Sequence, residues 1–233
     1  LQQVTASSKE YGPEMRALFT VPEDKVLVGA DLSGLELRCL AHYMKSDNYT
    51  KELLTGDIHA VNQKLAGLKT RDKAKTFIYA FLYGAGDAKI GSIVGRDSSV
   101  GKTIKERFLE NTPSLAKLKQ KVGKASDKGY LKALDGRHIR VRSEHAALNF
   151  LLQSAGAIIA KRAWVIFHEL ATHLNYKQLG VIHDEIQIEC RPEDAEEIGK
   201  LTVKAMELTT DYYKLGCPIT GEYKIGRSWN ETH

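Results

Sequence analysis

Two acidic positions far apart in the chain carry the strongest chemical signal in the sequence. Asp31 ends the short β-rich run 26–31, and Asp184 and Glu185 stand side by side within residues 181–186. An ionised carboxylate at the end of a buried strand costs free energy unless a cation or hydrogen bonds compensate. Brought together, such carboxylates offer the hard oxygen ligands that Mg²⁺ prefers, as two-metal phosphoryl transfer requires. Taken singly, they equally suit a helix N-cap and a turn.

A second pattern combines cations and phenols. Arg71, Lys75, Tyr79 and Tyr83 recur every four residues in the stretch 71–84. On an α-helix such positions drift by only about 40° per step, so all four line one side. Two cations followed by two phenols suit a triphosphate at one end and a stacked base or sugar at the other. An amphipathic helix with a polar stripe is the plain alternative.

The elements that must position these residues follow from periodicity and from turn residues. A buried strand is predicted over 26–31, a helix over 35–44 and a second helix over 71–84, where Gly84-Ala85-Gly86 stops it. The glycine- and serine-rich stretch 91–101 is predicted to be a loop. Residues 104–118 are predicted to be helical in two pieces that break near Pro113.

The second half of the chain mixes helices and strands. Asp135-Gly136-Arg137 predicts a turn between two strands, and residues 145–174 predict one long helix or two. Residues 180–190 alternate, with Ile186, Ile188 and Cys190 against acidic or amide side chains, which predicts a half-buried strand in a hairpin. A helix over 193–212 and a closing strand within 217–229 complete the chain. Because strands and helices do not strictly alternate, we expect an α+β fold.

Composition sets wide bounds. The 233 residues are 42% hydrophobic, enough for one large domain or two packed subdomains. The net charge of +5 suits a polyanionic partner without requiring one. For the lysine-rich stretch 117–132, a solvated mobile surface and a contact with a DNA backbone remain equal alternatives. The apolar stretch 150–170 is interrupted by Gln153, Lys161 and Arg162 and is predicted to be a buried helix rather than a membrane span.

In this order and spacing, the segments resemble the three signature motifs of family A DNA polymerases, the group that contains bacterial polymerase I. The resemblance runs along the whole chain and is strongest to the replicative polymerases of T-odd podophages. It is carried by the runs Ser33-Gly34-Leu35-Glu36-Leu37-Arg38-Cys39-Leu40-Ala41-His42, Thr76-Phe77-Ile78-Tyr79 and Phe81-Leu82-Tyr83-Gly84-Ala85-Gly86-Asp87.

The resemblance implies a right-hand polymerase fold, with an antiparallel palm sheet and an inserted helical fingers subdomain. It places palm at residues 1–60 and 136–233 and fingers at 61–135, and it leaves the thumb and the exonuclease domain outside the chain. It further implies template-directed addition of dNTPs to a primer 3′-OH with two Mg²⁺ ions, in DNA replication of viral type. The expected partners are a DNA primer–template, dNTPs, and the missing N-terminal portion or a partner chain. We expect no membrane association and a location in the cytoplasm of an infected bacterium.

For the metal ions, the resemblance implies Asp31, Asp184 and the backbone carbonyl of Leu32 as ligands, with Glu185 as an auxiliary acid beside the site. Glu36 resembles the steric gate that rejects ribonucleotides at the sugar 2′ position.

For the nucleotide, Arg71 and Lys75 resemble the triphosphate-binding cations, and His59 matches a histidine that touches the β-phosphate. The resemblance also implies a catalytic role for Lys75. Tyr83 resembles the aromatic residue near the templating base. At Tyr79 many family members carry phenylalanine, whereas the phage type carries tyrosine, which predicts ready acceptance of dideoxynucleotides.

For DNA, the resemblance implies minor-groove contacts for His145, Asn149 and Gln153, although many relatives carry arginine in place of His145. It implies an approach of His183 to the primer terminus and a phosphate contact for Arg137. A single-subunit RNA polymerase shares this architecture, but Glu36 argues against it. A catalytically silent DNA-binding module and a two-metal nuclease also compete with the polymerase assignment, and the nuclease would need more carboxylates than are present.

Overall fold

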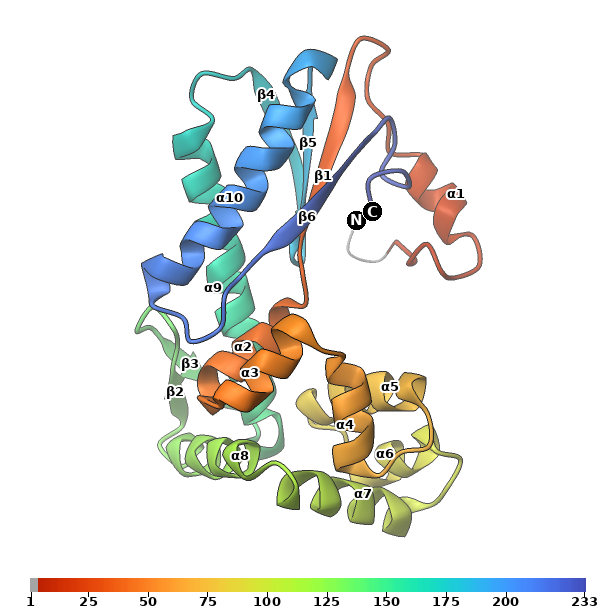
Figure 1. Ribbon diagram of the computed structural model, residues 1–233, viewed down its shortest axis with the longest axis vertical. Helices are drawn as coiled ribbons and strands as arrows, with labels where there is room; N and C mark the ends of the chain where they lie inside the picture. Colours follow the sequence, from red (N-terminus) through yellow and green to blue (C-terminus); the bar gives the residue numbers. More distant parts are fainter. Residues whose placement is uncertain (1–3) are drawn as a thin grey trace. The chain divides into compact units, whose positions relative to one another are not determined.

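The computed structural model describes residues 4–233, which form two compact units (Figure 1). The first contains the chain up to Leu35 together with Gly156–His233, and the second contains Glu36–Ala155. Strands and helices are mixed within the chain, which confirms the predicted α+β class. The predicted limits between palm and fingers, at residues 60 and 135, do not coincide with the limits of these compact units. The assignment of palm and fingers to those stretches stays a prediction.

The first unit is built on a four-stranded antiparallel sheet in the order β4-β5-β1-β6. Its central strand β1 pairs antiparallel with β5 on one side and with β6 on the other. The predicted strand over 26–31 and the predicted hairpin within 180–190 are both present. The strands are β1 (Val26–Leu32), β4 (Tyr176–Ile182), β5 (Glu185–Cys190) and β6 (Gly221–Gly226).

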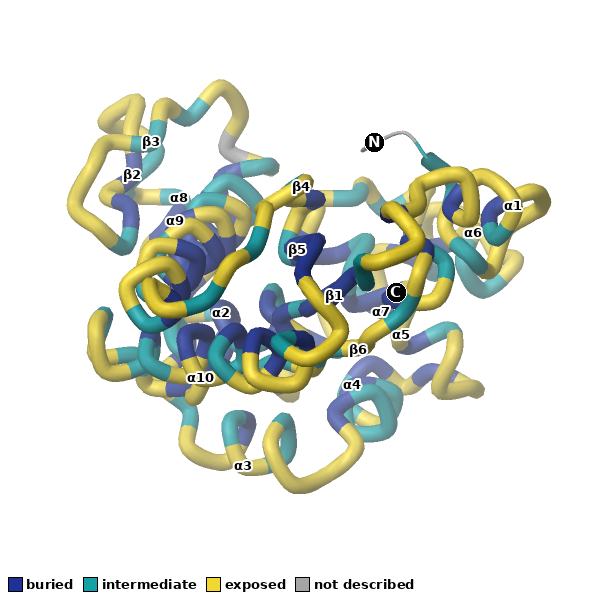
Figure 2. The backbone as a smooth tube through the Cα atoms, turned by 90° about the horizontal axis from the view of Figure 1, so that it is seen from above, coloured by how far each residue is buried: buried dark blue, intermediate teal, exposed yellow. Residues whose placement is uncertain are grey.

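Both faces of this sheet are covered. Helix α10 (Ala195–Tyr213) packs on β1 and β6, and Gly199 lies so close to the sheet that a Cβ there would stand 2.2 Å from the ring of Tyr223. On the opposite face, Trp229 and Thr232 reach β5 through hydrogen bonds to its polar side chains. All six residues of β5 are buried, and Figure 2 shows the strand as buried. The predicted half-buried alternation of this strand is wrong.

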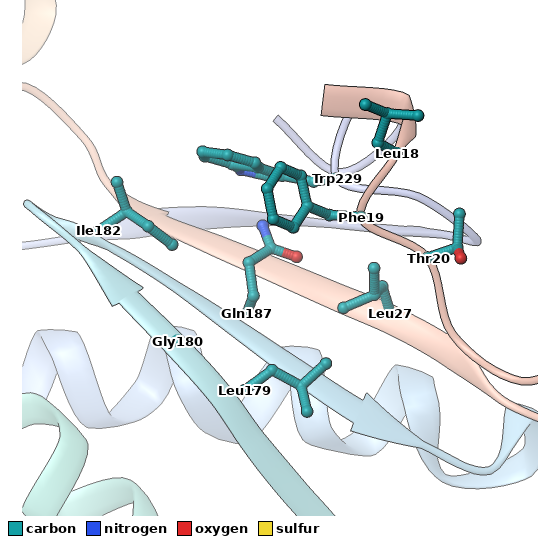
Figure 3. A pocket seen from close by; sticks show the side chains of 9 residues that line it. All are labelled: Leu18, Phe19, Thr20, Leu27, Leu179, Gly180, Ile182, Gln187 and Trp229. Atoms are coloured by element: carbon teal, nitrogen blue, oxygen red, sulfur yellow. The ribbon is translucent and has the colours of Figure 1, made fainter. Parts of the chain in front are cut away.

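A pocket of about 360 Å³ lies on the face that Trp229 covers (Figure 3). Leu179 and Ile182 come from β4 and Gln187 from β5, whereas Phe19 follows α1 (Gly12–Ala17). Its lining is mainly apolar and includes neither Asp31 nor Asp184, so the pocket carries none of the predicted catalytic groups.

The second unit is mainly helical around an aromatic core. The rings of Phe77, Phe81 and Phe108 pack with centroids 5.1 to 5.8 Å apart. The predicted helices over 35–44 and 71–84 are both present. The elements that begin in this unit or at its border are α2 (Leu35–Met44), α3 (Asp47–Thr55), α4 (Ile58–Ala66), α5 (Arg71–Leu82), α6 (Asp87–Ile93), α7 (Ser98–Glu110), α8 (Pro113–Ser126), β2 (Tyr130–Lys132), β3 (His138–Arg140), η1 (Glu144–Ala146) and α9 (Ala147–Leu170).

The predicted loop over 91–101 is wrong, because α6 and α7 occupy most of it. Asp97 caps α7 by accepting hydrogen bonds from the backbone N–H groups of Ser99 and Val100. A Cβ at Gly91 or Gly101 would lie 1.9 Å from a backbone carbonyl oxygen. The glycines therefore permit close helix packing instead of breaking the helices. The predicted break near Pro113 is present, with α8 beginning at that residue.

The long helix α9 accounts for most of the predicted segment 145–174. It begins at Ala147, so His145 lies in the preceding turn η1 and not on the same α-helix as Asn149 and Gln153. By length and composition alone, α9 is the one helix in residues 4–233 that could cross a membrane, but 56% of its most apolar window is buried inside the protein. This burial agrees with the prediction of a buried helix.

Candidate polymerase site

The sheet of the first unit brings the two predicted metal-binding aspartates to one end. Asp31 lies opposite Glu185 in the pairing of β1 with β5. Asp184 lies in the two-residue turn between β4 and β5, where His183 has φ 58°, the left-handed conformation that tight hairpin turns require. The backbone N–H of Leu32 donates to the carbonyl oxygen of Asp184 at 3.2 Å, which fixes the turn against the end of β1.

The electrostatics of Asp31 reflect this crowding. Burial raises its pKa to about 7, with further contributions from the negative charges of Asp184, Glu185 and Glu222, and Lys224 opposes them. Negative charge at this end of the sheet is thus only partly compensated by protein groups. A bound cation would compensate it, because a positive charge stabilises the ionised carboxylates.

Glu185 is held firmly by its own unit. Its side chain is buried, and it accepts hydrogen bonds from Trp229 Nε1 at 2.8 Å and from Gln187 Nε2. His233 Nδ1 lies 2.7 Å from the other carboxylate oxygen. Both oxygens are therefore engaged by the protein. No local pattern in the sequence indicates these partners, because Trp229 and His233 are more than forty residues away from Glu185 along the chain.

The donor set at this end of the sheet fits Mg²⁺ only in part. Within residues 4–233, no three His, Cys, Asp or Glu side chains come together in a way that could hold a metal ion. Mg²⁺ in phosphoryl-transfer sites is, however, commonly held by one or two carboxylates together with water and substrate phosphates. Asp31 and Asp184 match that smaller requirement.

In the second unit, α4 and α5 bring the predicted phosphate-binding residues together at their N-termini. Asp57 caps α4 by accepting from the backbone N–H groups of His59 and Ala60, and its other oxygen accepts from Arg71 Nε at 2.6 Å. This hydrogen bond lowers the pKa of Asp57. Asp57 thus joins the first turns of the two helices. Sequence reasoning did not select it, although a cap before a helix was a recognisable signal.

His59 lies beside the cations of α5. Burial, followed by the positive charges of Arg71 and Lys75, lowers its pKa, which favours the neutral imidazole. Its ring centroid is 6.3 Å from that of Tyr79, and its Nδ1 atom is buried without a hydrogen-bond partner in the part of the chain that the structure describes. Three predicted triphosphate-binding residues and Tyr79 therefore share one region of the second unit. His59 and Arg71 lie in the first turns of α4 and α5, and helix N-termini attract anions.

Glu36 is oriented by two other predicted site residues. Tyr83 Oη donates to Glu36 Oε1 at 2.6 Å, and Gln153 Nε2 donates to the same oxygen at 2.5 Å. Gly84 follows Tyr83 with φ 78°, and a Cβ there would lie 2.6 Å from the carbonyl oxygen of His145. Only glycine fits this contact, so it fixes the end of α5 and with it the phenol that holds Glu36.

The remaining predicted DNA-binding residues are spread over η1, α9, the β2–β3 turn and the β4–β5 turn. Asn149 is half-buried on α9, and His145 is exposed in η1. Arg137 is exposed and forms an ion pair with Asp135 at 2.5 Å. His183 belongs to the first unit, where it is exposed in the β4–β5 turn.

Comparison with known proteins gives this arrangement a family. The model for DNA polymerase family A matches residues 1–231. The DNA-directed DNA polymerase of Enterobacteria phage T3 is 42% identical over an alignment that covers 100% of this chain, and that of Escherichia phage T7 is 41% identical over the same share. The chain spans only 38% of the length of each of these relatives.

A solved structure with the same fold is the POL domain of Pol1 from M. smegmatis, in complex with DNA primer-template and dNTP. It superposes with a TM-score of 0.87 at 23% identity, covering 99% of this chain and 44% of that one. This likeness concerns the fold, and the family assignment rests on the sequence matches. The chain belongs to DNA polymerase family A.

Proposed function

We propose that this chain is the palm and fingers part of a DNA-directed DNA polymerase, which extends a primer 3′-OH with dNTPs on a DNA template. The observation that carries the proposal is the carboxylate pair at one end of the sheet. Asp31 and Asp184 are close enough for the charge of one to raise the pKa of the other. The names of the phage relatives, which match this chain along its whole length, support the same activity.

Asp31, Asp184 and the carbonyl of Leu32 would hold two Mg²⁺ ions. When bound, Mg²⁺ would lower the pKa of an attacking hydroxyl and stabilise charge on the leaving oxygen. Glu185 would act as a positioning residue. Its carboxylate is held by Trp229 and His233, and its negative charge raises the pKa of Asp31.

Arg71, Lys75 and His59 would bind the triphosphate. Arg71 and Lys75 supply positive charge at the start of α5, and Lys75 would stabilise the charge that develops on the leaving group. His59, held neutral by its surroundings, would donate one hydrogen bond to a phosphate oxygen. Asp57 would release Arg71, or share it, when a triphosphate arrives.

Glu36 and Tyr79 would select the sugar. The hydrogen bonds from Tyr83 and Gln153 keep the Glu36 carboxylate in one orientation, as a steric gate against a 2′-hydroxyl requires. Tyr79 would place a phenol where an incoming dideoxynucleotide lacks its 3′-OH. Tyr83 would also stand near the templating base.

The DNA itself would be contacted by His145, Asn149 and Gln153 in the minor groove, by His183 near the primer terminus and by Arg137 at a phosphate. Minor-groove acceptors are almost the same for every correct pair, so such contacts test the geometry of a pair and not its sequence. Because the chain spans 38% of its phage relatives, we assign the remaining grip on DNA to an N-terminal portion or a partner chain. We further propose that the enzyme acts in viral replication, in the cytoplasm of a bacterial host.

Primer extension tests the proposal directly. The chain, alone and with the N-terminal portion of a phage relative supplied, is incubated with a DNA primer–template, Mg²⁺ and all four dNTPs. We expect extension that Asp184→Ala abolishes and that Asp24→Ala, at an exposed aspartate in a loop, leaves intact. No extension under either condition would contradict the polymerase assignment and favour a silent DNA-binding module. Degradation of the primer would favour a nuclease, and equal use of rNTPs an RNA polymerase.

A further inference from the structure

The positive charge of the chain is concentrated in one stretch of the second unit. Residues 113–142 contain nine Lys and Arg against two Asp, a net charge of +7, whereas the rest of the chain has 25 against 27, a net charge of −2. The total of +5 therefore comes entirely from α8 and the β2–β3 hairpin. None of the nucleotide-binding or metal-binding residues proposed above lies on these elements.

The pairing of the hairpin places a compact set of residues on its outer face. Tyr130 lies opposite Arg140 and Lys132 lies opposite His138, while the intervening pair Leu131 and Ile139 points the other way. Leu131 is buried, and β2 packs against α8. Tyr130, Lys132, His138 and Arg140 thus form one exposed surface, the basic hairpin face.

In the described residues, both this face and the adjoining helix α8 carry cations that form no ion pair with an acid. Within residues 4–233, no ion pair engages Lys132, Arg140 or the α8 lysines Lys117, Lys121 and Lys124. Those three lysines recur at steps of four and three residues and share one face of α8. Cations gathered without acids repel one another, and a polyanion would relieve that repulsion.

An aromatic pair distinguishes between polyanions. The rings of Tyr130 and His138 are stacked, with centroids 4.0 Å apart and planes at 26°, and Tyr130 is 40% exposed. Stacked aromatic rings bordered by cations bind single-stranded nucleic acid, because unpaired bases stack on the rings while Lys and Arg follow the backbone. The bases of a duplex are already stacked on one another, and the carboxylates of an acidic peptide have no ring to stack, so neither would gain this contact.

We propose that the basic hairpin face binds single-stranded nucleic acid without sequence preference, with a base stacked on Tyr130 and phosphates at Lys132 and Arg140. This site goes beyond the proposed function, since it lies on elements that carry none of the proposed catalytic groups. That the strand is the unpaired template ahead of synthesis rests on the proposed function.

The test is fluorescence anisotropy of a labelled oligothymidylate of about 20 nucleotides, longer than one binding site. Binding is measured over a series of salt concentrations in EDTA, in an Asp184→Asn background, so the result does not depend on synthesis. The variants are Lys132→Gln with Arg140→Gln, Tyr130→Leu and Tyr130→Phe. The matched control is Lys51→Gln with Lys64→Gln, two exposed lysines elsewhere in the same unit.

We expect the double charge variant to bind more weakly and to reduce the slope of log K against log salt by about 1.4, since each phosphate contact contributes about 0.7 on a single strand. Tyr130→Leu should weaken binding at least about fivefold with an unchanged slope, and Tyr130→Phe should retain the affinity. Parental binding by all variants, or an equal loss in the lysine control, would overturn the proposal. Competition by polyglutamate as strong as by oligothymidylate, with no effect of Tyr130→Leu, would identify the face as an acidic-peptide surface instead.

Discussion

At the scale of single residues, Asp31 shows most clearly how position changes chemistry. Its pKa is raised from 3.8 to about 7, first by burial and then by Asp184, Glu185 and Glu222. The folded protein therefore keeps a proton that the unfolded chain loses. In the metal-free protein, the contribution of Asp31 to the free energy of unfolding is fully present below the unfolded pKa of 3.8. This contribution is lost as the pH rises to about 7.

Asp31→Asn removes this cost. We expect the variant to be more stable than the parent at about pH 8 in EDTA, by on the order of 1–2 kcal/mol after allowance for solvent screening. The difference should become small near about pH 3, below the unfolded pKa of 3.8, where Asp31 is mostly protonated in both states. Urea unfolding at the two pH values measures it, with Asp24→Asn at an exposed site as control. A difference that does not change with pH would contradict the assignment.

Glu36→Ala should open the sugar site to ribonucleotides. The parent side chain is held by two hydrogen bonds, so its removal leaves space where the 2′-hydroxyl would otherwise meet a fixed carboxylate. We expect the preference for dCTP over CTP, measured as the ratio of kcat/KM values, to fall at least about tenfold. Glu106→Ala, on the exposed side of α7, should leave the ratio unchanged. An unaltered ratio in Glu36→Ala would exclude the gate.

Tyr79→Phe should separate dideoxynucleotides from normal ones. In the parent, the phenol would replace a hydrogen bond that the missing 3′-OH cannot make, so ddTTP and dTTP should be used with similar efficiency. Loss of one hydrogen bond to a charged group corresponds to about 10- to 100-fold discrimination against ddTTP in the variant. Single-nucleotide incorporation measures both substrates. Strong discrimination that is the same in parent and variant would refute this role.

At the scale of elements, β5 is the strand whose environment matters most. It carries Glu185, all six of its residues are buried, and Trp229 and Thr232 of the C-terminal tail form hydrogen bonds with Glu185 and Gln187 on one of its faces. Gly29 of β1 lies under that tail, and a Cβ there would stand 2.5 Å from the carbonyl oxygen of Thr232 and from Gln187 Nε2. The tail therefore reaches the sheet of the first unit only because residue 29 has no side chain.

Gly29→Ala should displace the tail. Overpacking of this kind typically costs about 1–3 kcal/mol, which for a chain of this size lowers Tm by roughly 2–10 °C. Glu185 should lose part of its support at the same time, so primer extension should weaken as well. Gly86→Ala, where a Cβ meets nothing within 4 Å, is the matched control for stability. Equal melting temperatures of the parent and Gly29→Ala would show that the tail is not held there.

The periodicity of the sequence sufficed to locate the elements but not their surroundings. The strand at β1 and the helices at α2 and α5 were predictable, because their apolar spacing is local. The two-sided burial of β5 was not, since the covering residues Trp229 and Thr232 come from the far end of the chain. The prediction of a loop over 91–101 was wrong because glycine occurs both in loops and where helices pack closely, and a local pattern does not separate the two.

At the scale of the whole molecule, the two compact units contain different parts of the proposed chemistry. The carboxylates Asp31 and Asp184 belong to the first unit, and Arg71, Lys75 and Glu36 belong to the second. The order and spacing of these motifs in the sequence predicted both groups. The sequence did not reveal Asp57, which pairs with Arg71, or His233, which supports Glu185, because each acts through a contact that folding creates.

Asp184 is expected to bind the metal ion that nucleotide addition requires, and an exchange of ligand tests this role most directly. Single-nucleotide incorporation is measured for the parent and for Asp184→Cys, with the N-terminal portion supplied, in Mg²⁺ and in Mn²⁺. Thiolate is a poor ligand for Mg²⁺ and a better one for softer ions. We predict that the variant is inactive in Mg²⁺ and regains at least about tenfold in Mn²⁺. A variant that matches the parent in Mg²⁺ would contradict the account.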